Sequence, residues 1–182
     1  MLCFEEGGYD ETTTALIAKR AGIAVGTLYG YFENKRDILL EVVDHTLGEV
    51  SGLVVEQLDP AAWRGRDPRE VVRTLIDTIF HIQTVRPGTQ RVIYERYFKD
   101  DAFHDLVEAR QLPVREAIVR FLEGVGPGHG LRALDREAAA LAIYNTVQWN
   151  ATQAIMSFSD APAAIDAAAR EAADMIDRYL FA

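Results

Sequence analysis

Apolar residues recur at the spacing of an α-helix along almost the whole chain, whereas the alternation typical of β-strands is nearly absent. In residues 68–85, for example, Val72, Ile76 and Ile79 follow one another at steps of four and three. With 182 residues, of which 49% are hydrophobic and 26% charged, the chain is long enough to bury a core without disulfides or metals. The pattern predicts an all-α protein.

Local signals place the ends of the expected helices. Gly7-Gly8 stops the first one, Thr12 is an expected N-cap, Gly22 an expected left-handed C-cap and Asn34 a second N-cap. Pro113 is expected to interrupt or kink a later helix. The helices are expected over residues 1–8, 13–21, 25–32, 35–58, 68–85, 89–98, 102–123, 136–158 and 162–181.

Two short helices joined by a glycine-containing turn, over residues 13–21 and 25–32, have the outline of a helix-turn-helix. The second one contains Gly26 and Gly30 and is too short to be stable alone, so its neighbours must hold it in place. Its small residues allow a close approach to another surface. Groups that suit phosphates or base edges are the hydroxyls of Thr27, Tyr29 and Tyr31 and the ammonium of Lys35.

Residues 8–39, GYDETTTALIAKRAGIAVGTLYGYFENKRDIL, resemble the DNA-binding head of TetR-type (TetR/AcrR) transcriptional regulators. The resemblance implies an N-terminal helix-turn-helix DNA-binding domain over residues 1–48, followed by a helical ligand-binding and dimerisation domain over residues 49–182. It also implies a homodimer on a palindromic operator in double-stranded DNA. A small apolar or aromatic effector would release such a repressor from its operator. The matched residues are Gly8-Tyr9, Thr12-Thr13, Ile17-Ala18, Ala21-Gly22-Ile23, Gly26-Thr27-Leu28-Tyr29, Tyr31-Phe32, Lys35 and Leu39.

The resemblance also assigns roles within the head by position. By position, seven residues of the head would contact DNA, three of them at base edges and four at phosphates. The residues at the bases are Val25, Gly26 and Thr27, and those at the phosphates are Thr13, Tyr29, Tyr31 and Lys35.

The small core of the head and two departures from the family follow from the same resemblance. Ala24 stands where such regulators usually have a capping serine, and a missing cap costs about 1 kcal/mol. Cys3-Phe4 falls where the family has its last core pair of the first helix, so that helix is expected to be truncated here. The expected core residues are Leu16, Ile17, Ile23, Leu28 and Phe32.

The negative net charge of the chain argues against DNA binding. The formal net charge is −9, and residues 1–48 carry four basic and eight acidic side chains, a net of −4. Because phosphate binding depends on Lys and Arg, this balance taken alone weighs against a nucleic-acid protein. We therefore expect weak non-specific DNA binding and a strong dependence on residues upstream of the chain.

Aromatic residues gather in the middle of the chain, where the resemblance suggests an effector pocket between helices. The same aromatic residues would also suit an ordinary hydrophobic core, and His81 would equally suit a surface position. The residues expected at the effector are Phe80, His81, Tyr94, Tyr97, Phe98, Phe103, Tyr144, Gln148 and Trp149.

The last two helices resemble the dimer interface of the family. In the final helix, apolar residues form a seam at steps of four and three, although packing within one chain would produce the same pattern. The residues expected at the dimer interface are Ile155, Ile165, Ala169, Ala172 and Ile176.

Other classes of protein find little support. No arrangement typical of a catalytic nucleophile, paired catalytic carboxylates or a zinc site can be singled out, and Cys3 is the single cysteine. We expect no enzyme, no cofactor, no metal and no membrane span, and a cytoplasmic location. An alternative prediction is an all-α ligand-binding or protein-interaction module with a degenerate DNA-binding head.

Overall fold

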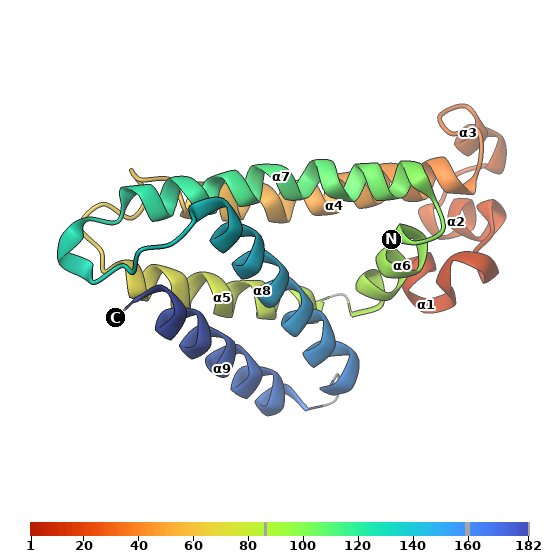
Figure 1. The fold of residues 1–182 in the computed structure, drawn as a ribbon. Coiled ribbons are helices and arrows are strands. Elements are labelled where there is room, and N and C mark those ends of the chain that lie inside the picture. The colour runs from red at the N-terminus through yellow and green to blue at the C-terminus, as the bar shows by residue number, and fades with distance from the viewer. Residues whose placement is uncertain (86, 159–160, 182) are drawn as a thin grey trace. The chain divides into compact units, whose positions relative to one another are not determined.

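The computed structural model describes residues 1–85, 87–158 and 161–181. Within them the regular structure is helical (Figure 1), apart from one isolated antiparallel bridge between Leu131 and Phe181. None of the helices in this part of the chain combines the length and apolar character needed to cross a membrane. The elements are α1 (Leu2–Glu11), α2 (Thr14–Ala21), α3 (Val25–Tyr29), α4 (Lys35–Gln57), α5 (Pro68–Val85), α6 (Pro87–Tyr97), α7 (Asp101–Gly124), the short 3₁₀ turn η1 (Pro127–His129), α8 (Arg136–Phe158) and α9 (Pro162–Leu180).

The chain divides into two compact units. The N-terminal unit comprises residues 1–49 and 86–110, and the C-terminal unit comprises residues 50–85 and 111–182. The prediction of a first domain over residues 1–48 did not include the second segment of the N-terminal unit, and the last residue of the predicted second domain lies outside the described residues.

The N-terminal unit has its own core. Helix α6 packs on α1 at Gly88, where the backbone of Glu5 leaves no room for a side chain. The buried side chains come from the first four helices, from α6 and from the start of α7. They are Phe4, Ala18, Leu28, Ile38, Leu39, Val43, Val92, Ile93, Phe103 and Val107.

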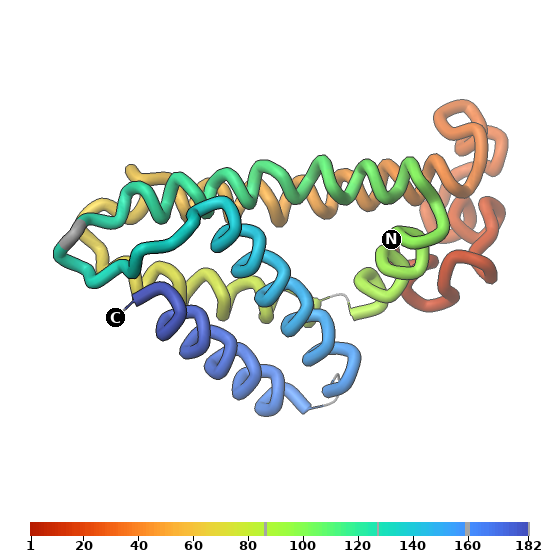
Figure 2. The backbone as a smooth tube through the Cα atoms, in the orientation of Figure 1, coloured from red at the N-terminus to blue at the C-terminus, as the bar shows by residue number. Residues whose placement is uncertain are grey.

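The C-terminal unit is built around α5, α8 and α9, which pack on one another. Figure 2 shows the backbone paths of α8 and α9 lying side by side. Their contact faces are rich in alanine, including Ala140, Ala151 and Ala173, and small side chains allow helices to approach closely. At the start of this unit Trp63 packs on Phe121, with ring centroids 5.0 Å apart.

Most helix positions follow the predictions, but several ends differ. Helix α1 continues to Glu11 through a kink at Gly8, whose φ is 72°, instead of stopping at Gly7-Gly8. Helix α3 ends at Tyr29, and α6 begins at Pro87, because proline is compatible with the first turn of a helix.

The prediction that Thr12 caps α2 is wrong, since Thr13 does so. The Thr12 hydroxyl is buried and lies 2.9 Å from the carbonyl oxygen of Cys3 and 2.7 Å from that of Gly8. It therefore hydrogen-bonds to α1, at Cys3 and at the kink at Gly8, and does not cap α2. The prediction that Leu16 and Ile23 belong to the core of the head is also wrong, because they are 44% and 41% exposed.

Candidate nucleic-acid interface

Helix α2 is defined at both ends by hydrogen bonds. The backbone N–H of Leu16 donates to the Thr13 hydroxyl over 3.1 Å, which caps the start of α2. At its other end Gly22 adopts a left-handed conformation, with a φ of 70°, and the N–H of Ile23 donates to the Ala18 carbonyl over 3.1 Å. The expected C-cap at Gly22 is confirmed.

Helix α3 is short and lacks a side-chain cap. Ala24 precedes it in an extended conformation and makes no side-chain hydrogen bond, as its methyl group dictates. Leu28 is its buried residue, at 5% exposure, and anchors the helix in the core of the N-terminal unit. The backbone N–H groups of Tyr31 and Phe32 donate to the Leu28 carbonyl and carry the chain away from α3.

The side of α3 that faces solvent carries the residues predicted to contact DNA. Val25, Tyr29 and Tyr31 are 38%, 53% and 80% exposed, and a Cβ built on Gly26 would meet nothing within 4 Å. Thr27 is exposed as well. The hydroxyls of Tyr29 and Thr14 lie 3.0 Å apart and connect α3 to α2. The arrangement presents a small, accessible helical surface with hydroxyl groups, while its contacts to bases and phosphates remain predictions.

Lys35 begins α4 and already has partners inside the protein. Its ammonium donates to the carbonyl oxygens of Tyr9, over 2.6 Å, and Asp10, over 3.2 Å. It also lies 4.3 Å from the centroid of the Tyr9 ring. A cation at the carbonyl end of a helix is favourable, so Lys35 stabilises the end of α1. The sequence assigned Lys35 to phosphate and did not reveal this role.

The other basic side chains of residues 1–48 are paired, with one exception. Arg20 forms a two-fold hydrogen-bonded ion pair with Glu6, which lowers the pKa of that carboxyl group. Arg36 pairs with Asp100. Lys19 is exposed, and its ammonium makes no hydrogen bond or ion pair within the described residues. The positive charge available to DNA from this segment is therefore small.

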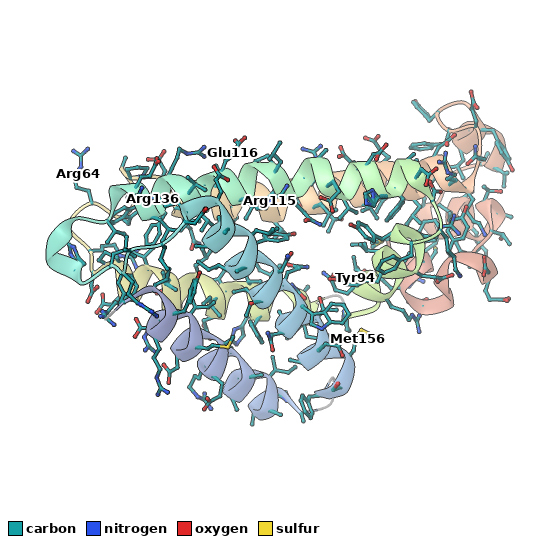
Figure 3. The ribbon with its side chains drawn as sticks, in the orientation of Figure 1. Arg64, Tyr94, Arg115, Glu116, Arg136 and Met156 are labelled. Atoms are coloured by element: carbon teal, nitrogen blue, oxygen red, sulfur yellow. The ribbon has the colours of Figure 1, made fainter. Side chains whose placement is uncertain are left out.

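The residues predicted to bind an effector are divided between the two units. In the N-terminal unit Phe103 is buried in the core, whereas Phe98 is 78% exposed. The Tyr97 hydroxyl donates to Glu108 over 2.7 Å, and this bond raises the pKa of Tyr97 to about 12. Tyr94, labelled in Figure 3, is half-buried on α6.

In the C-terminal unit Phe80 lies fully buried in the core, and the partly buried Tyr144 packs against that core. Trp149 is 54% exposed. His81 is also exposed, on the surface of α5, where Nδ1 lies 2.8 Å from the Asp77 carbonyl oxygen and Nε2 lies 3.4 Å from Asp166.

Gln148 belongs to a polar network between α5 and α8. The Gln83 amide donates to Gln148 over 3.3 Å, and the Thr152 hydroxyl lies 2.9 Å from the Gln148 carbonyl oxygen. Gln83 and Thr152 are buried. The sequence did not single out Gln83, because one glutamine near the end of an amphipathic helix carries no motif.

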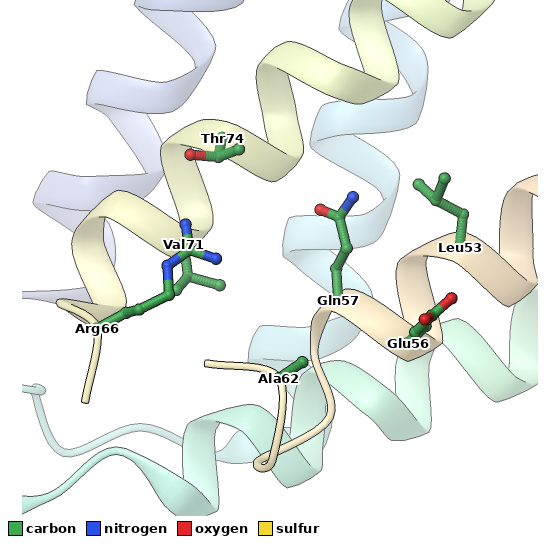
Figure 4. Close-up of a pocket in the computed structure, with 7 residues that line it drawn as sticks. All are labelled: Leu53, Glu56, Gln57, Ala62, Arg66, Val71 and Thr74. Atoms are coloured by element: carbon green, nitrogen blue, oxygen red, sulfur yellow. The ribbon is translucent and has the colours of Figure 1, made fainter. Parts of the chain in front are cut away.

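One pocket in the C-terminal unit has a volume of about 330 Å³. Figure 4 shows that its wall comes from the end of α4, the loop before α5 and the start of α5. None of the predicted effector residues lines it, and the effector site remains a prediction. The lining residues are Leu53, Glu56, Gln57, Ala62, Arg66, Val71 and Thr74.

The five residues predicted for the dimer interface lie inside this chain. Ile155, Ile165, Ala169, Ala172 and Ile176 are 1% to 5% exposed and belong to the core of the C-terminal unit. Their seam joins α9 to α5 and α8. The pattern therefore reflects packing within one chain, which is the alternative that the sequence had left open.

Other apolar side chains of α8 and α9 face solvent. Leu141, Trp149 and Met156 of α8 are 44%, 54% and 56% exposed, and Met175 of α9 is 49% exposed. Figure 3 labels Met156 on α8. We call these four residues the outer apolar surface.

Comparison with known proteins finds a family and relatives to which the N-terminal segment is similar. Residues 1–42 match the sequence profile of the family described as "Bacterial regulatory proteins, tetR family". A 44-residue segment, 24% of this chain, is 46% identical to the "Fatty acid metabolism regulator protein" of Bacillus subtilis (strain 168). The matched segments span 23% and 30% of the lengths of two curated relatives.

Solved structures share the fold of almost the whole chain. A TetR transcription regulator from Haloarcula marismortui superposes with a TM-score of 0.78 at 19% identity, over 98% of this chain and 93% of that one. The regulator FadR from Bacillus subtilis, solved in complex with stearoyl-CoA, superposes with a TM-score of 0.74 at 21% identity, over 96% and 92%. At such identities the likeness concerns the fold.

Proposed function

We propose that the protein is a ligand-responsive, DNA-binding transcriptional regulator, on the premise that residues 1–42 match the profile of the bacterial tetR family of regulatory proteins. More specifically, it is a repressor that leaves its operator when a small apolar effector binds. Its DNA-reading helix is α3, its effector and dimerisation domain is the helical remainder, and it acts in the cytoplasm, where the DNA is.

The solvent-facing side of α3 carries this proposal. The five-residue helix is held in place by its buried residue Leu28. Gly26 and Thr27 leave the opposite side small enough to enter a major groove. Tyr31 projects almost freely into solvent beside it. An exposed aromatic hydroxyl next to a small helical surface suits a phosphate contact that flanks base contacts.

One observation favours the alternative of a helical binding module with a degenerate head. Lys35, Arg36 and Arg20 are engaged within the protein, so residues 1–48 offer few free cations. If DNA binding nonetheless occurs, hydroxyl groups and backbone N–H groups must contribute much of it. Its salt dependence is then shallow, because few counterions are released.

Selection from a random double-stranded DNA library tests the main proposal with the full chain. The proposal expects enrichment of a palindromic sequence, and a mobility shift with that sequence should then be specific against shuffled DNA. Tyr31→Ala should weaken the shift about tenfold, the amount lost with one hydrogen bond to a charged group. Enrichment of no sequence at all supports the alternative.

The proposed effector carries a long apolar chain. The curated relative is named for fatty acid metabolism, and the FadR structure holds stearoyl-CoA. Stearoyl-CoA is therefore the first probe for release of the selected operator, with coenzyme A as the control that lacks the chain. Release by stearoyl-CoA alone supports this effector class, and retention of the operator with both excludes it.

The proposed homodimer forms through the outer apolar surface. Large exposed apolar patches on soluble proteins often mark protein–protein interfaces. Leu141, Trp149, Met156 and Met175 expose apolar side chains on α8 and α9, the two helices that the sequence had assigned to dimerisation. The proposal keeps those helices and replaces the buried residues by the exposed ones.

A further inference from the structure

Asp100 lies between α6 and α7 and holds two arginines. Its side chain is only 5% exposed. Arg36 of α4 donates to it twice, from Nε over 2.6 Å and from Nη2 over 2.7 Å, and Arg96 of α6 donates over 3.2 Å. The backbone N–H of Phe103 lies 3.3 Å from the same carboxylate, which therefore also caps α7. We call Arg36, Arg96 and Asp100 the Asp100 cluster.

The carboxylate is what allows the two guanidinium groups to lie close together. Hydrogen bonds from Arg36, and one further bond from Arg96, hold the pKa of Asp100 far below its usual range, so it is charged at neutral pH. Without that charge Arg36 and Arg96 would face each other as uncompensated cations in a partly buried place. Arg36, the second residue of α4, would then have to move.

Tyr9 closes the contacts between the same helices. Lys35 and Arg96 each lie 4.3 Å from the centroid of its ring, within the range of cation–π attraction. Arg96 thus contacts both Tyr9 and Asp100, while Lys35 contacts the end of α1. The contacts join the end of α1, the start of α4, the end of α6 and the start of α7 into a closed circuit.

Two members of this circuit, Lys35 and Arg36, begin the helix that follows α3 in sequence. Only residues 30–34 separate the end of α3 from the start of α4, so any displacement of Arg36 is transmitted to α3 over a very short segment. The five residues of α3 have only Leu28 as a buried anchor. The position of the start of α4 therefore decides much of the position of α3.

We infer that Asp100, a residue outside the helix-turn-helix segment, is a positioning residue for DNA reading, and that it acts through Arg36 on α4 and thereby on α3. The inference rests on the proposed DNA-binding function. It makes residues 86–110 a working part of the DNA-reading unit, although no residue of that segment need touch DNA.

The chain contains a matched control for this role. Arg110 of α7 donates twice to Asp44 of α4, over 2.6 Å each, so a second bidentate pair joins α4 to the segment 86–110. Asp44 serves a single arginine and lies two turns beyond the start of α4. The Asp44 side chain is 34% exposed, against 5% for Asp100, and its loss leaves no second arginine facing Arg110.

Asp100→Asn and Asp44→Asn change the net charge by the same amount. Each removes one negative charge, and long-range electrostatics alone would make both variants bind DNA more tightly. A loss of affinity in Asp100→Asn alone is therefore opposite in sign to the charge effect. Only a change of position explains it.

The test measures operator affinity of the full chain by fluorescence anisotropy, with the sequence that the wild type selects from a random double-stranded library. The measurement is made at a temperature where thermal unfolding shows every variant to be folded. We expect Asp100→Asn to bind at least about tenfold more weakly, and Asp44→Asn to bind within about twofold of the wild type or more tightly. Arg36→Lys, which keeps the charge but loses the planar fork, should weaken binding at least about threefold.

Three results would overturn the inference and leave the proposed function standing, and a fourth would overturn both. Asp100→Asn that binds within twofold of the wild type shows that Asp100 has no positioning role. Equal losses in Asp100→Asn and Asp44→Asn show a general structural effect. If Asp100→Asn does not fold, Arg36→Lys decides, and unchanged affinity in that variant refutes the inference. A wild type that selects no sequence refutes the proposed function itself, and the inference falls with it.

Discussion

The backbone of Gly88 in α6 lies directly against the backbone of Glu5 in α1, and a Cβ at position 88 would lie 2.8 Å from the Glu5 carbonyl oxygen. Thr89, the residue after Gly88, also contacts Glu5, because its hydroxyl lies 2.5 Å from the Glu5 carboxylate. Gly88→Ala should destabilise the protein by about 1–3 kcal/mol, because rigid backbone must move to admit the methyl group. This exceeds the gain of about 0.5–1 kcal/mol that alanine brings to a helix. Urea unfolding at neutral pH measures the difference.

Gly52 in α4 is the matched control for that substitution. It is exposed within a helix, and a Cβ there would meet nothing within 4 Å. Gly52→Ala should therefore stabilise the protein by about 0.5–1 kcal/mol. Similar losses at both glycines would show that close packing on Glu5 is not the cause.

A serine at position 24 should strengthen the DNA-reading helix. Ala24 has the extended conformation of an N-cap, with φ of −69° and ψ of 144°, but no side-chain oxygen. Ala24→Ser supplies one for a free N–H at the start of α3 and should add about 0.5–2 kcal/mol to the free energy of unfolding. Operator affinity should rise too, because less ordering is left for the moment of binding. Ala24→Val, which also lacks a side-chain oxygen and is as poor an N-cap as alanine, is the comparison in both measurements.

Features that depend on a few neighbouring residues were predictable from the sequence. The left-handed Gly22 and the N-cap at Asn34, whose side-chain oxygen accepts from the Asp37 N–H over 3.1 Å, follow from local chemistry. Apolar periodicity, together with the break at Pro87-Gly88, placed α5 and α8 at the bounds that the structure shows, although the predicted bounds were approximate. The TetR resemblance in the head was recognisable for the same reason, since its matched residues lie within one short segment.

Features that depend on distant parts of the chain were not predictable. Arg36 and Asp100 are 64 residues apart, and no pattern in either segment announces their pairing. Periodicity shows that Ile165 and Ile176 share an apolar face, but it does not show whether that face covers the same chain or a partner. Leu16 is exposed because the close contact of α2 is made by a smaller residue, Ala18, which is completely buried.

His81 should give the C-terminal unit a pH-dependent stability. Its hydrogen bond to the Asp77 carbonyl, assisted by the charges of Asp77 and Asp166, raises the pKa of the imidazole. A raised pKa in the folded state adds stability that is fully present below the unfolded value of about 6.5 and is lost as pH rises through the folded value. Unfolding free energies between about pH 6 and pH 8 should fall in the wild type and change less in His81→Gln. Equal slopes in both proteins would show that His81 does not contribute.

Charge placed on the outer apolar surface should separate the proposed dimer without unfolding the subunit. Met156 is 56% exposed, so Met156→Glu costs the monomer little, but in an interface it would bury an unpaired carboxylate at a cost of several kcal/mol. Leu112→Glu on α7 is the matched control, because Leu112 is 49% exposed and lies outside this surface. Light scattering after size-exclusion chromatography should give a dimer for the wild type and Leu112→Glu, and a monomer for Met156→Glu with a retained thermal transition. A dimer in all three proteins would place the interface elsewhere, and a monomeric wild type would refute the dimer itself.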